Sequence, residues 1–202
     1  MTYSEVDAKE IISRYPVPRS ALLPLLHLVQ SVDGCITPAG IEFCASMLEL
    51  TGAEVTAVAT FYSMYRRKPC GDYLVGVCTN TLCAVLGGDA IVEHLSNHLG
   101  IDVGETTSDQ KITLERVECN AACDYAPVVM VNWEFFDNQT PESITGVVDA
   151  LRKGKRVTAT RGADIGTFQE TSRLLAGFPD GKPSGDPGAP TLAGLEAARP
   201  DR

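Results

Sequence analysis

The segment Y-L-V-G-V-C-T-N-T-L-C, residues 73–83, joins a short apolar run to two cysteines. The run Tyr73–Val77 predicts a strand that carries Cys78 at its end. A polar turn over Thr79–Leu82 then leads to Cys83. We therefore expect two thiols to lie close together at the end of one strand.

The same arrangement recurs in V-E-C-N-A-A-C, residues 117–123. The alternating segment Ile112–Val117 predicts a strand that leads to Cys119 and then to Cys123. The two cysteine pairs are spaced C-x4-C and C-x3-C, with 35 residues between them. Four thiols on two tight loops are the ligand set of a metal centre.

The two pairs suit a [2Fe–2S] cluster, because each iron needs two thiolates beside the two bridging sulfides. A four-cysteine zinc site uses similar spacings and stays open as an alternative at this point. A structural disulfide pair is disfavoured, because no signal peptide is evident and cytosolic proteins rarely keep disulfides. The C-x-x-C spacing of a thioredoxin-type redox dithiol is absent from the sequence.

The composition is that of an ordinary globular protein with an acidic balance. Its 202 residues leave room for one domain with an appendage or for two small domains, and 44% of them are apolar. The formal charge is 17 − 26 = −9, which argues against nucleic acid or an anionic membrane surface as the main partner. We expect a cytoplasmic protein without direct membrane insertion, since neither an export signal nor a membrane-length apolar run is evident.

Residues 1–68 have the spacing of a small four-helix bundle with short loops. Such a unit has a small hydrophobic core, so we expect contact with a partner protein to stabilise it. Aromatic residues and Met are enriched at interface cores. We therefore predict that Phe61–Tyr65 and the Leu22–Val29 helix lie at or just beneath a contact with that partner.

Residues 72–155 predict the element order β-α-β-β-β-α, which suits a thioredoxin-like α/β sandwich with a parallel first strand pair. The expected fold class is thus mixed α/β (α+β), with the helical bundle ahead of this domain. Residues 177–202 are rich in Gly and Pro, and such a composition buries too little to offset the ordering entropy. We therefore expect residues 156–202 to form an extended or disordered tail.

Other residues of chemical interest have simpler interpretations. His94 and His98 share a helix face without an H-E-x-x-H pattern, so we interpret them as solvated. His27 lies among leucines and is expected in a core or an interface. Three cysteines have no partner at ligand spacing and are assigned no site: Cys35, Cys44 and Cys70.

The sequence contains neither G-x-G-x-x-G nor G-x-x-x-x-G-K-[ST], the phosphate-binding patterns of nucleotide sites. The chain thus has the ligands for an electron centre without a recognisable site for an organic redox cofactor. If NADH is oxidised, we expect that reaction on another polypeptide, and we assign no catalytic residue here.

Five segments together resemble the small [2Fe–2S] protein (24 kDa type, the E subunit) of bacterial NADH–quinone oxidoreductase, or respiratory complex I. The resemblance extends over about residues 10–155. The segments are A-L-L-P-L-L-H-L-V-Q (21–30), V-A-T-F-Y-S-M-Y (58–65), V-C-T-N-T-L-C (77–83), L-G-I-D-V-G-E-T-T-S-D (99–109) and V-E-C-N-A-A-C-D-Y-A-P (117–127).

The resemblance implies an electron-transfer subunit with a thioredoxin-like [2Fe–2S] ferredoxin domain behind a helical domain. It implies one cluster per chain, with Cys78, Cys83, Cys119 and Cys123 as its ligands. It also implies docking on a subunit that binds FMN and NADH, beside further iron–sulfur subunits. The complex would be membrane-bound, with this subunit in its peripheral arm on the cytoplasmic side. Two alternatives stay open: the equivalent diaphorase subunit of an NAD-linked hydrogenase or formate dehydrogenase, and a four-cysteine zinc interaction module.

The chain departs from the family pattern at two places. Ala121 stands where many relatives resemble C-x-G-x-C, and its Cβ is expected to restrict the approach of backbone N–H groups to the cluster sulfurs. The segment beyond about residue 157 lies outside the pattern. We expect a low reduction potential, because the chain is acidic and apolar neighbours limit water; these neighbours are Val77, Leu82, Ala84 and Ala126.

Overall fold

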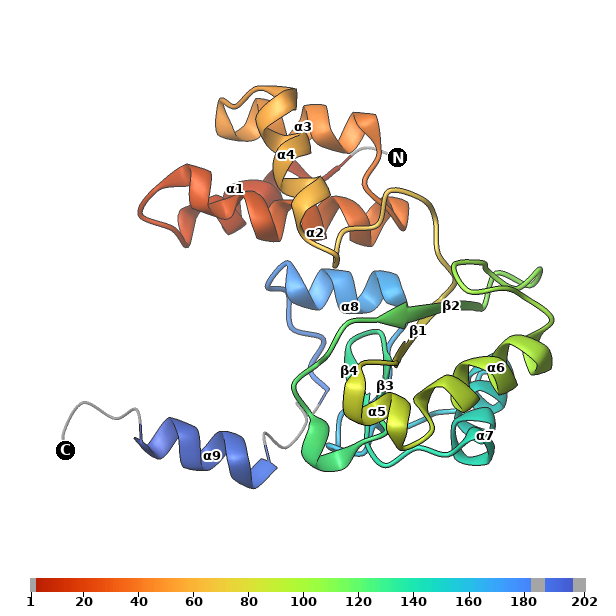
Figure 1. Ribbon diagram of the computed structural model, residues 1–202. Helices are drawn as coiled ribbons and strands as arrows, with labels where there is room; N and C mark the ends of the chain where they lie inside the picture. The colour runs from red at the N-terminus through yellow and green to blue at the C-terminus, as the bar shows by residue number, and fades with distance from the viewer. Residues whose placement is uncertain (1–2, 183–187, 198–202) are drawn as a thin grey trace. The chain divides into compact units, whose positions relative to one another are not determined.

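The computed structural model describes residues 3–182 and 188–197, and the chain divides into two compact units (Figure 1). We call them the helical unit and the sheet unit. The helical unit comprises Met1–Tyr73, Ser108–Lys111 and Gly166–Asp180, and the sheet unit comprises Leu74–Thr107, Ile112–Ile165 and Gly181–Arg202.

Local sequence signals set the helix ends in the helical unit. The side chains of Ser4 and Thr37 cap two helices by accepting from backbone N–H groups, and Gly34 ends another with a left-handed φ of 72°. The helices are α1 (Glu5–Ser13), the 3-10 helix η1 (Pro18–Ala21), α2 (Leu22–Asp33), α3 (Pro38–Leu48), α4 (Gly52–Phe61) and α8 (Phe168–Leu175).

Helix α2 is the centre of this unit. Leu25, Leu26 and Val29 are fully buried on it, and α1, α3, α4 and α8 all pack against it. Because α2 packs among the unit's own helices, most of its Leu22–Val29 segment is core, although Leu23 is 40% exposed. That this helix lies at or just beneath a partner contact stays a prediction.

The expected tail is wrong for residues 156–180. Residues 168–175 form α8, which lies alongside α2 in Figure 1. Thr167 and Glu170 form a reciprocal capping box at its start, and the Gly- and Pro-rich composition begins only after this helix. Farther on, Gly188–Ala197 form a helix, α9, whereas residues 183–187 and 198–202 lie outside the described part.

Phe168 anchors the returning segment. Its side chain is 2% exposed, and its backbone N–H donates to the carbonyl of Asp72 over 2.7 Å. Gln169 donates through Nε2 to the carbonyl of Val32 over 3.0 Å. Between α2 and α8, the Gln30 side-chain amide donates to the buried Ser172 hydroxyl. The C-terminal segment therefore completes the core of the helical unit.

We predict that Phe168→Ala lowers the free energy of unfolding of the helical unit by about 3–5 kcal/mol, the usual cost of deleting a buried aromatic ring. Leu174→Ala is the matched control, because that side chain is on the same helix but 43% exposed. Hydrogen exchange of α2 amides in the full chain measures both effects. Equal protection in the two variants would contradict the anchoring role of Phe168.

Tyr65 is a core residue and does not itself offer a partner contact; that Phe61–Tyr65 lies at or just beneath such a contact stays a prediction. It is 7% exposed, and its hydroxyl donates to the carbonyl of Leu23 over 2.9 Å. Phe61 and Tyr62 are 79% and 46% exposed. Only these two members of the aromatic segment remain available to a partner.

His27 is a core histidine, as expected. It is 8% exposed, its ring lies 4.9 Å from that of Tyr65, and burial lowers its pKa to about 4. Its Nδ1 has no hydrogen-bond partner among residues 3–182 and 188–197. The folded state therefore favours the neutral imidazole.

The lowered pKa predicts a pH dependence of stability between pH 6.5 and about pH 4. In this window the unfolded chain binds a proton that folded His27 does not, so stability is highest above pH 6.5 and falls as the pH drops. The shift limits the loss to about 3 kcal/mol. Denaturant titrations of the wild type and His27→Phe across this window test the effect. An equally steep loss in both proteins would exclude His27 as the cause.

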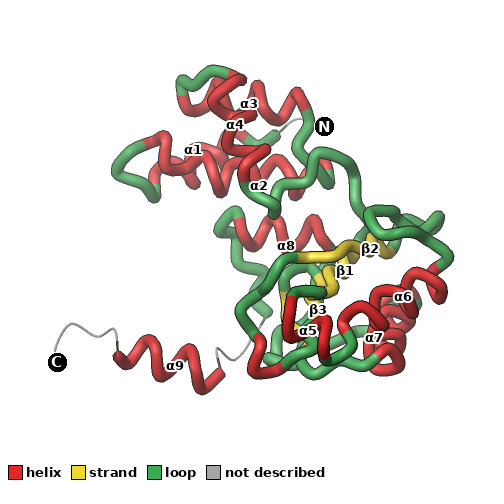
Figure 2. Tube along the Cα trace, in the orientation of Figure 1, coloured by secondary structure: helices red, strands yellow, loops and turns green. Residues whose placement is uncertain are grey.

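The described part of the sheet unit contains four strands, β1 to β4, in the spatial order β2-β1-β3-β4. Figure 2 draws strands in yellow, with β2 beside β1. β3 pairs antiparallel with both neighbours, with Val75 opposite Val131 and Met130 opposite Phe135. β3 and β4 thus form a hairpin, and the parallel direction of β1 and β2 stays a prediction. The elements are β1 (Tyr73–Cys78), α5 (Thr81–Val85), α6 (Gly88–Leu99), β2 (Ile112–Val117), the 3-10 helix η2 (Cys123–Tyr125), β3 (Val129–Val131), β4 (Glu134–Phe136) and α7 (Pro141–Arg152).

Helices α6 and α7 pack against each other in this unit. Their buried stripes include Ile91 and Leu95 on α6 and Ile144 on α7. At the rim, His98 Nε2 lies 2.9 Å from Asp149 Oδ1 and links the two helices. The face of α6 that carries His94 and His98 is exposed, as expected.

Candidate metal centre

The first thiol pair is carried from a strand into a helix. Cys78 is the last residue of β1, and Cys83 lies in α5; both are almost fully buried. Asn80 starts this helix by accepting from the backbone N–H of Thr81 over 3.0 Å. The segment between the cysteines is thus the start of a helix rather than only a polar turn.

The second pair follows β2. Cys119 lies just beyond the strand and Cys123 begins η2, and both thiols are exposed. Their Sγ atoms are 3.7 Å apart. Two thiolates bound at about 2.3 Å to one tetrahedral metal lie about 3.8 Å apart. The spacing therefore fits two ligands of one metal ion.

The two pairs lie together. Cys78 and Cys83 share a small buried cluster with Ala122 from the loop between Cys119 and Cys123. Val128 completes the cluster, with partly buried apolar neighbours around it: Val117, Ala126 and Phe135. The loop that carries the second pair thus packs against the buried first pair in the sheet unit.

The pKa shifts of the thiols reflect how close the two cysteine pairs lie to each other. Burial raises the pKa of Cys83 to about 11, with a further rise from the Cys78 thiol and from the charge of Cys123. The pKa of Cys123 is raised mainly by its hydrogen bond to Cys119 and by the charge of that residue. Burial and the charge of Cys78 raise it further. Four thiolates in this space repel one another, and bound metal cations would offset that repulsion.

Two backbone N–H groups already point at the thiols. Ala121 donates to Cys119 Sγ over 3.3 Å, and Val128 donates to the Cys83 thiol. Ala121 has a left-handed φ of 55°, the region that favours glycine and costs other residues about 1 kcal/mol. The Cβ of Ala121 therefore strains the loop without preventing its N–H from reaching Cys119.

Gly88 is a site residue that the sequence analysis missed. A Cβ at this position would lie 2.5 Å from the carbonyl oxygen of Cys78 and 2.9 Å from that of Cys83. Only glycine allows α6 to begin so close to both ligand residues. The sequence signal was the Gly87-Gly88 pair, which closely follows the second cysteine of the first pair.

We predict that Gly88→Ala displaces the backbone of Cys78 and Cys83 and lowers stability by about 1–3 kcal/mol, the range for overpacking. The matched control is Gly146→Ala in α7, where an added Cβ meets nothing within 4 Å. Thermal unfolding measures stability, and metal analysis measures occupancy of the site. Metal retention and stability equal to those of the control would show that the close approach is not required.

The donor set fits a dinuclear iron–sulfur group, because each pair can supply two thiolates to one iron. Both pairs have close thiol–thiol contacts, namely Cys119 with Cys123 and Cys83 with Cys78. Throughout the described ranges, no three His, Cys, Asp or Glu side chains are grouped so that they could hold one metal ion.

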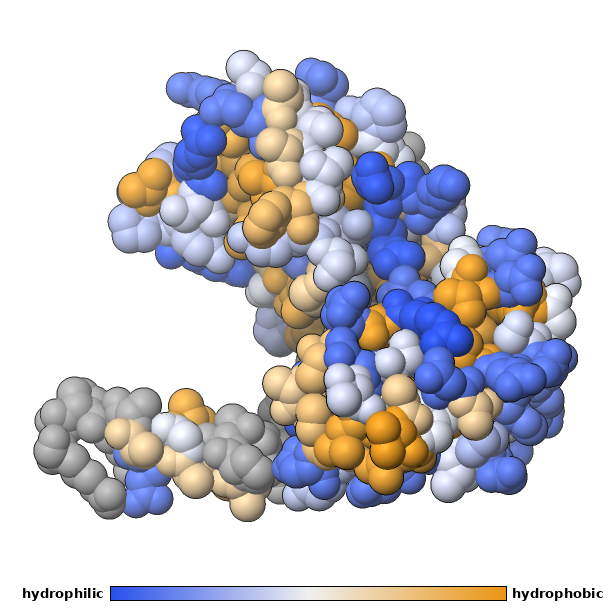
Figure 3. All heavy atoms as spheres, in the orientation of Figure 1, coloured by the Kyte–Doolittle hydropathy of each residue, from blue (hydrophilic) through white to orange (hydrophobic). Residues whose placement is uncertain are grey.

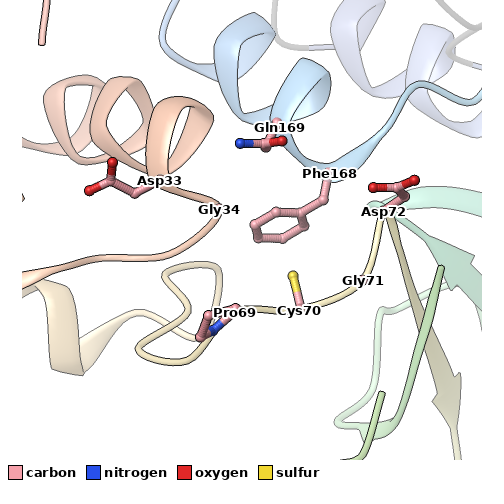
Figure 4. Close-up of a pocket in the computed structure, with 8 residues that line it drawn as sticks. All are labelled: Asp33, Gly34, Pro69, Cys70, Gly71, Asp72, Phe168 and Gln169. Atoms are coloured by element: carbon pink, nitrogen blue, oxygen red, sulfur yellow. The ribbon is translucent and has the colours of Figure 1, made fainter. Parts of the chain in front are cut away.

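The other three cysteines belong to the helical unit. Cys44 is fully buried, and burial raises its pKa to about 12; Cys35 is also buried. Cys70 lies half-buried in a pocket of about 170 Å³, where its thiol points toward the Phe168 ring (Figure 4). None of the three belongs to the thiol cluster of the sheet unit.

Apolar side chains gather over α5, beside the first ligand pair (Figure 3). Val85 is 78% exposed, and Leu82 and Leu86 are also exposed. Leu82 was expected to shield the centre, yet 43% of it remains exposed. We call Leu82, Val85 and Leu86 the α5 patch.

The fold and the four thiols define a thioredoxin-like iron–sulfur protein. The family profile for thioredoxin-like [2Fe–2S] ferredoxins matches residues 8–152. The chain belongs to this family, and membership implies a [2Fe–2S] cluster.

Individual relatives are more informative about this chain than the family profile. The E subunits of the NADH-quinone oxidoreductases of Mycobacterium tuberculosis and Mycobacterium bovis are 68% identical over 198 residues, which cover 96% of this chain and 79% of theirs. The E subunit of the Rickettsia bellii NADH-quinone oxidoreductase is 43% identical over 148 residues, covering 72% of this chain and 89% of its own.

Among solved structures, an NAD+-reducing [NiFe]-hydrogenase in the air-oxidised state matches with a TM-score of 0.59 and 20% identity. The match covers 66% of this chain and 23% of the hydrogenase chain. At this identity the likeness supports the fold alone. No helix in the described part of the chain is long and apolar enough to cross a membrane.

Proposed function

We propose that Cys78, Cys83, Cys119 and Cys123 hold one [2Fe–2S] cluster, with one cysteine pair on each iron. The contact within each pair and the shared buried cluster support this assignment. When bound, such a cluster carries one electron at a time. We assign the chain no catalytic residue.

The apolar residues around the thiols would limit the access of water to the cluster. Phe135 packs against the buried thiols, and the Arg161 guanidinium lies 3.9 Å from its ring centre. Arg161 is held in turn by two hydrogen bonds of 3.1 Å to the Asp137 carboxylate. The segment after α7 thus braces the apolar wall of the site.

We infer that the chain is the electron-transferring E subunit of an NADH–quinone oxidoreductase. The observation that carries this inference is the 68% identity to mycobacterial E subunits over 96% of the chain. NADH and FMN would bind to a partner subunit, and further iron–sulfur subunits would complete the path. This chain would lie in the peripheral arm on the cytoplasmic side of the complex.

Substitution of the proposed ligands tests the cluster assignment. We predict that the purified chain contains about two irons and two sulfides and gives a spin-half EPR signal after reduction by dithionite. Alanine at any of the four ligand positions should abolish the signal, because metal binding contributes to the folding free energy of such sites. Cys70→Ser should leave the signal unchanged, since Cys70 lies in the helical unit.

Two results would contradict the assignment. One is a Cys119→Ala protein that keeps the full signal. The other is stoichiometric zinc without visible absorption in protein made with ample iron, which would favour the zinc alternative.

The exposed aromatic pair offers a test of the partner. Phe61 and Tyr62 form an edge-on pair with ring centres 5.0 Å apart, and aromatic residues are enriched at interface cores. We predict that Phe61→Glu reduces co-purification of the flavin subunit without lowering the melting temperature of the isolated chain. Val6→Glu is the matched control, because Val6 is a similarly exposed apolar residue on α1.

Unchanged co-purification of the Phe61→Glu protein would remove this surface from the docking proposal. Equal losses in the Phe61→Glu and Val6→Glu proteins would also argue against a specific role for Phe61.

A further inference from the structure

Asn120 is a buried hydrogen-bond donor without an acceptor. It stands between Cys119 and Ala121 in the second ligand loop. Its Nδ2 is shielded from solvent and has no partner among the residues that the structure describes. A buried polar group left unsatisfied destabilises the folded chain, so the position calls for an acceptor.

The corresponding amide in the first ligand loop is satisfied. Asn80 Nδ2 donates to Glu118 Oε2 over 3.1 Å, and its Oδ1 accepts from the N–H of Thr81. Glu118, the carboxylate beside Cys119 in sequence, is thus already bonded to Asn80. The two loops therefore differ, because Asn80 Nδ2 has an acceptor whereas Asn120 Nδ2 has none in the described part of the chain.

A bound cluster would bring the missing acceptors to this loop. Its thiolate and sulfide sulfurs carry negative charge, and hydrogen bonds to charged acceptors are stronger than neutral ones. The N–H of the next residue, Ala121, already donates to Cys119 Sγ. A sulfur acceptor for Asn120 would extend the same pattern from the backbone to a side chain.

We propose that Asn120 Nδ2 donates a hydrogen bond to a sulfur of the cluster and raises its reduction potential. Reduction adds negative charge to the cluster, so the bond stabilises the reduced form more than the oxidised form. Asn120 is thus a positioning residue that tunes the centre rather than a ligand. The inference rests on the proposed cluster at Cys78, Cys83, Cys119 and Cys123.

The test compares the full-length, cluster-loaded wild type with Asn120→Leu by EPR-monitored redox titration. The leucine variant removes the donor at similar size, and we expect the equilibrium constant for reduction to fall about three- to tenfold. A tenfold fall corresponds to about 59 mV for one electron. Asn97→Leu on the exposed face of α6 is the control and should leave the midpoint unchanged.

A second measurement needs only the wild type, in case the leucine variant loses its cluster. Asparagine labelled with ¹⁵N in the side-chain amide should give a pulsed-EPR hyperfine coupling to the reduced cluster. Where the variant keeps its cluster, Asn120→Leu should lose this coupling and Asn97→Leu should keep it.

Loss of the cluster and loss of the Asn120 hydrogen bond give different experimental results. A wild-type protein without a [2Fe–2S] signal would overturn the proposed function. A normal signal without amide coupling, or with an unchanged midpoint in Asn120→Leu, would overturn the role of Asn120 alone.

Discussion

The proximity of four thiols is the constraint on which the rest of the sheet unit depends. Cys119 and Cys123 have Sγ atoms 3.7 Å apart, and Cys78 and Cys83 are buried beside the same loop. Thiolates at this distance repel one another, so the ligand loops need both metal cations and a firm scaffold. The sheet supplies the scaffold, because one pair of thiols follows β1 and the other follows its neighbour β2.

Backbone conformation then sets the positions of the thiols within the two loops. Gly88 lets α6 begin against the carbonyls of Cys78 and Cys83, and Ala121 accepts a left-handed φ so that its N–H meets Cys119. On the far side of the apolar wall, Arg161 braces Phe135. These contacts explain how short loops can hold the four proposed ligands in place.

Much of this could be predicted from the sequence, because strand alternation, helix caps and cysteine spacing are local signals. The two strands that precede the cysteine pairs follow from such signals, and the ligand role of the four cysteines stays a prediction. The packing of α8 could not be predicted, since Phe168 bonds to Asp72, a partner far away in sequence. The same limit applies to Tyr65, whose burial depends on how α2 meets the end of α4.

X-ray absorption at the iron edge of the purified chain can show whether the two cysteine pairs bind two adjacent irons. We expect an all-sulfur first shell around each iron and a second iron as its nearest metal neighbour. A zinc-only protein would contradict it. So would an iron site with nitrogen or oxygen ligands, or one without a neighbouring iron.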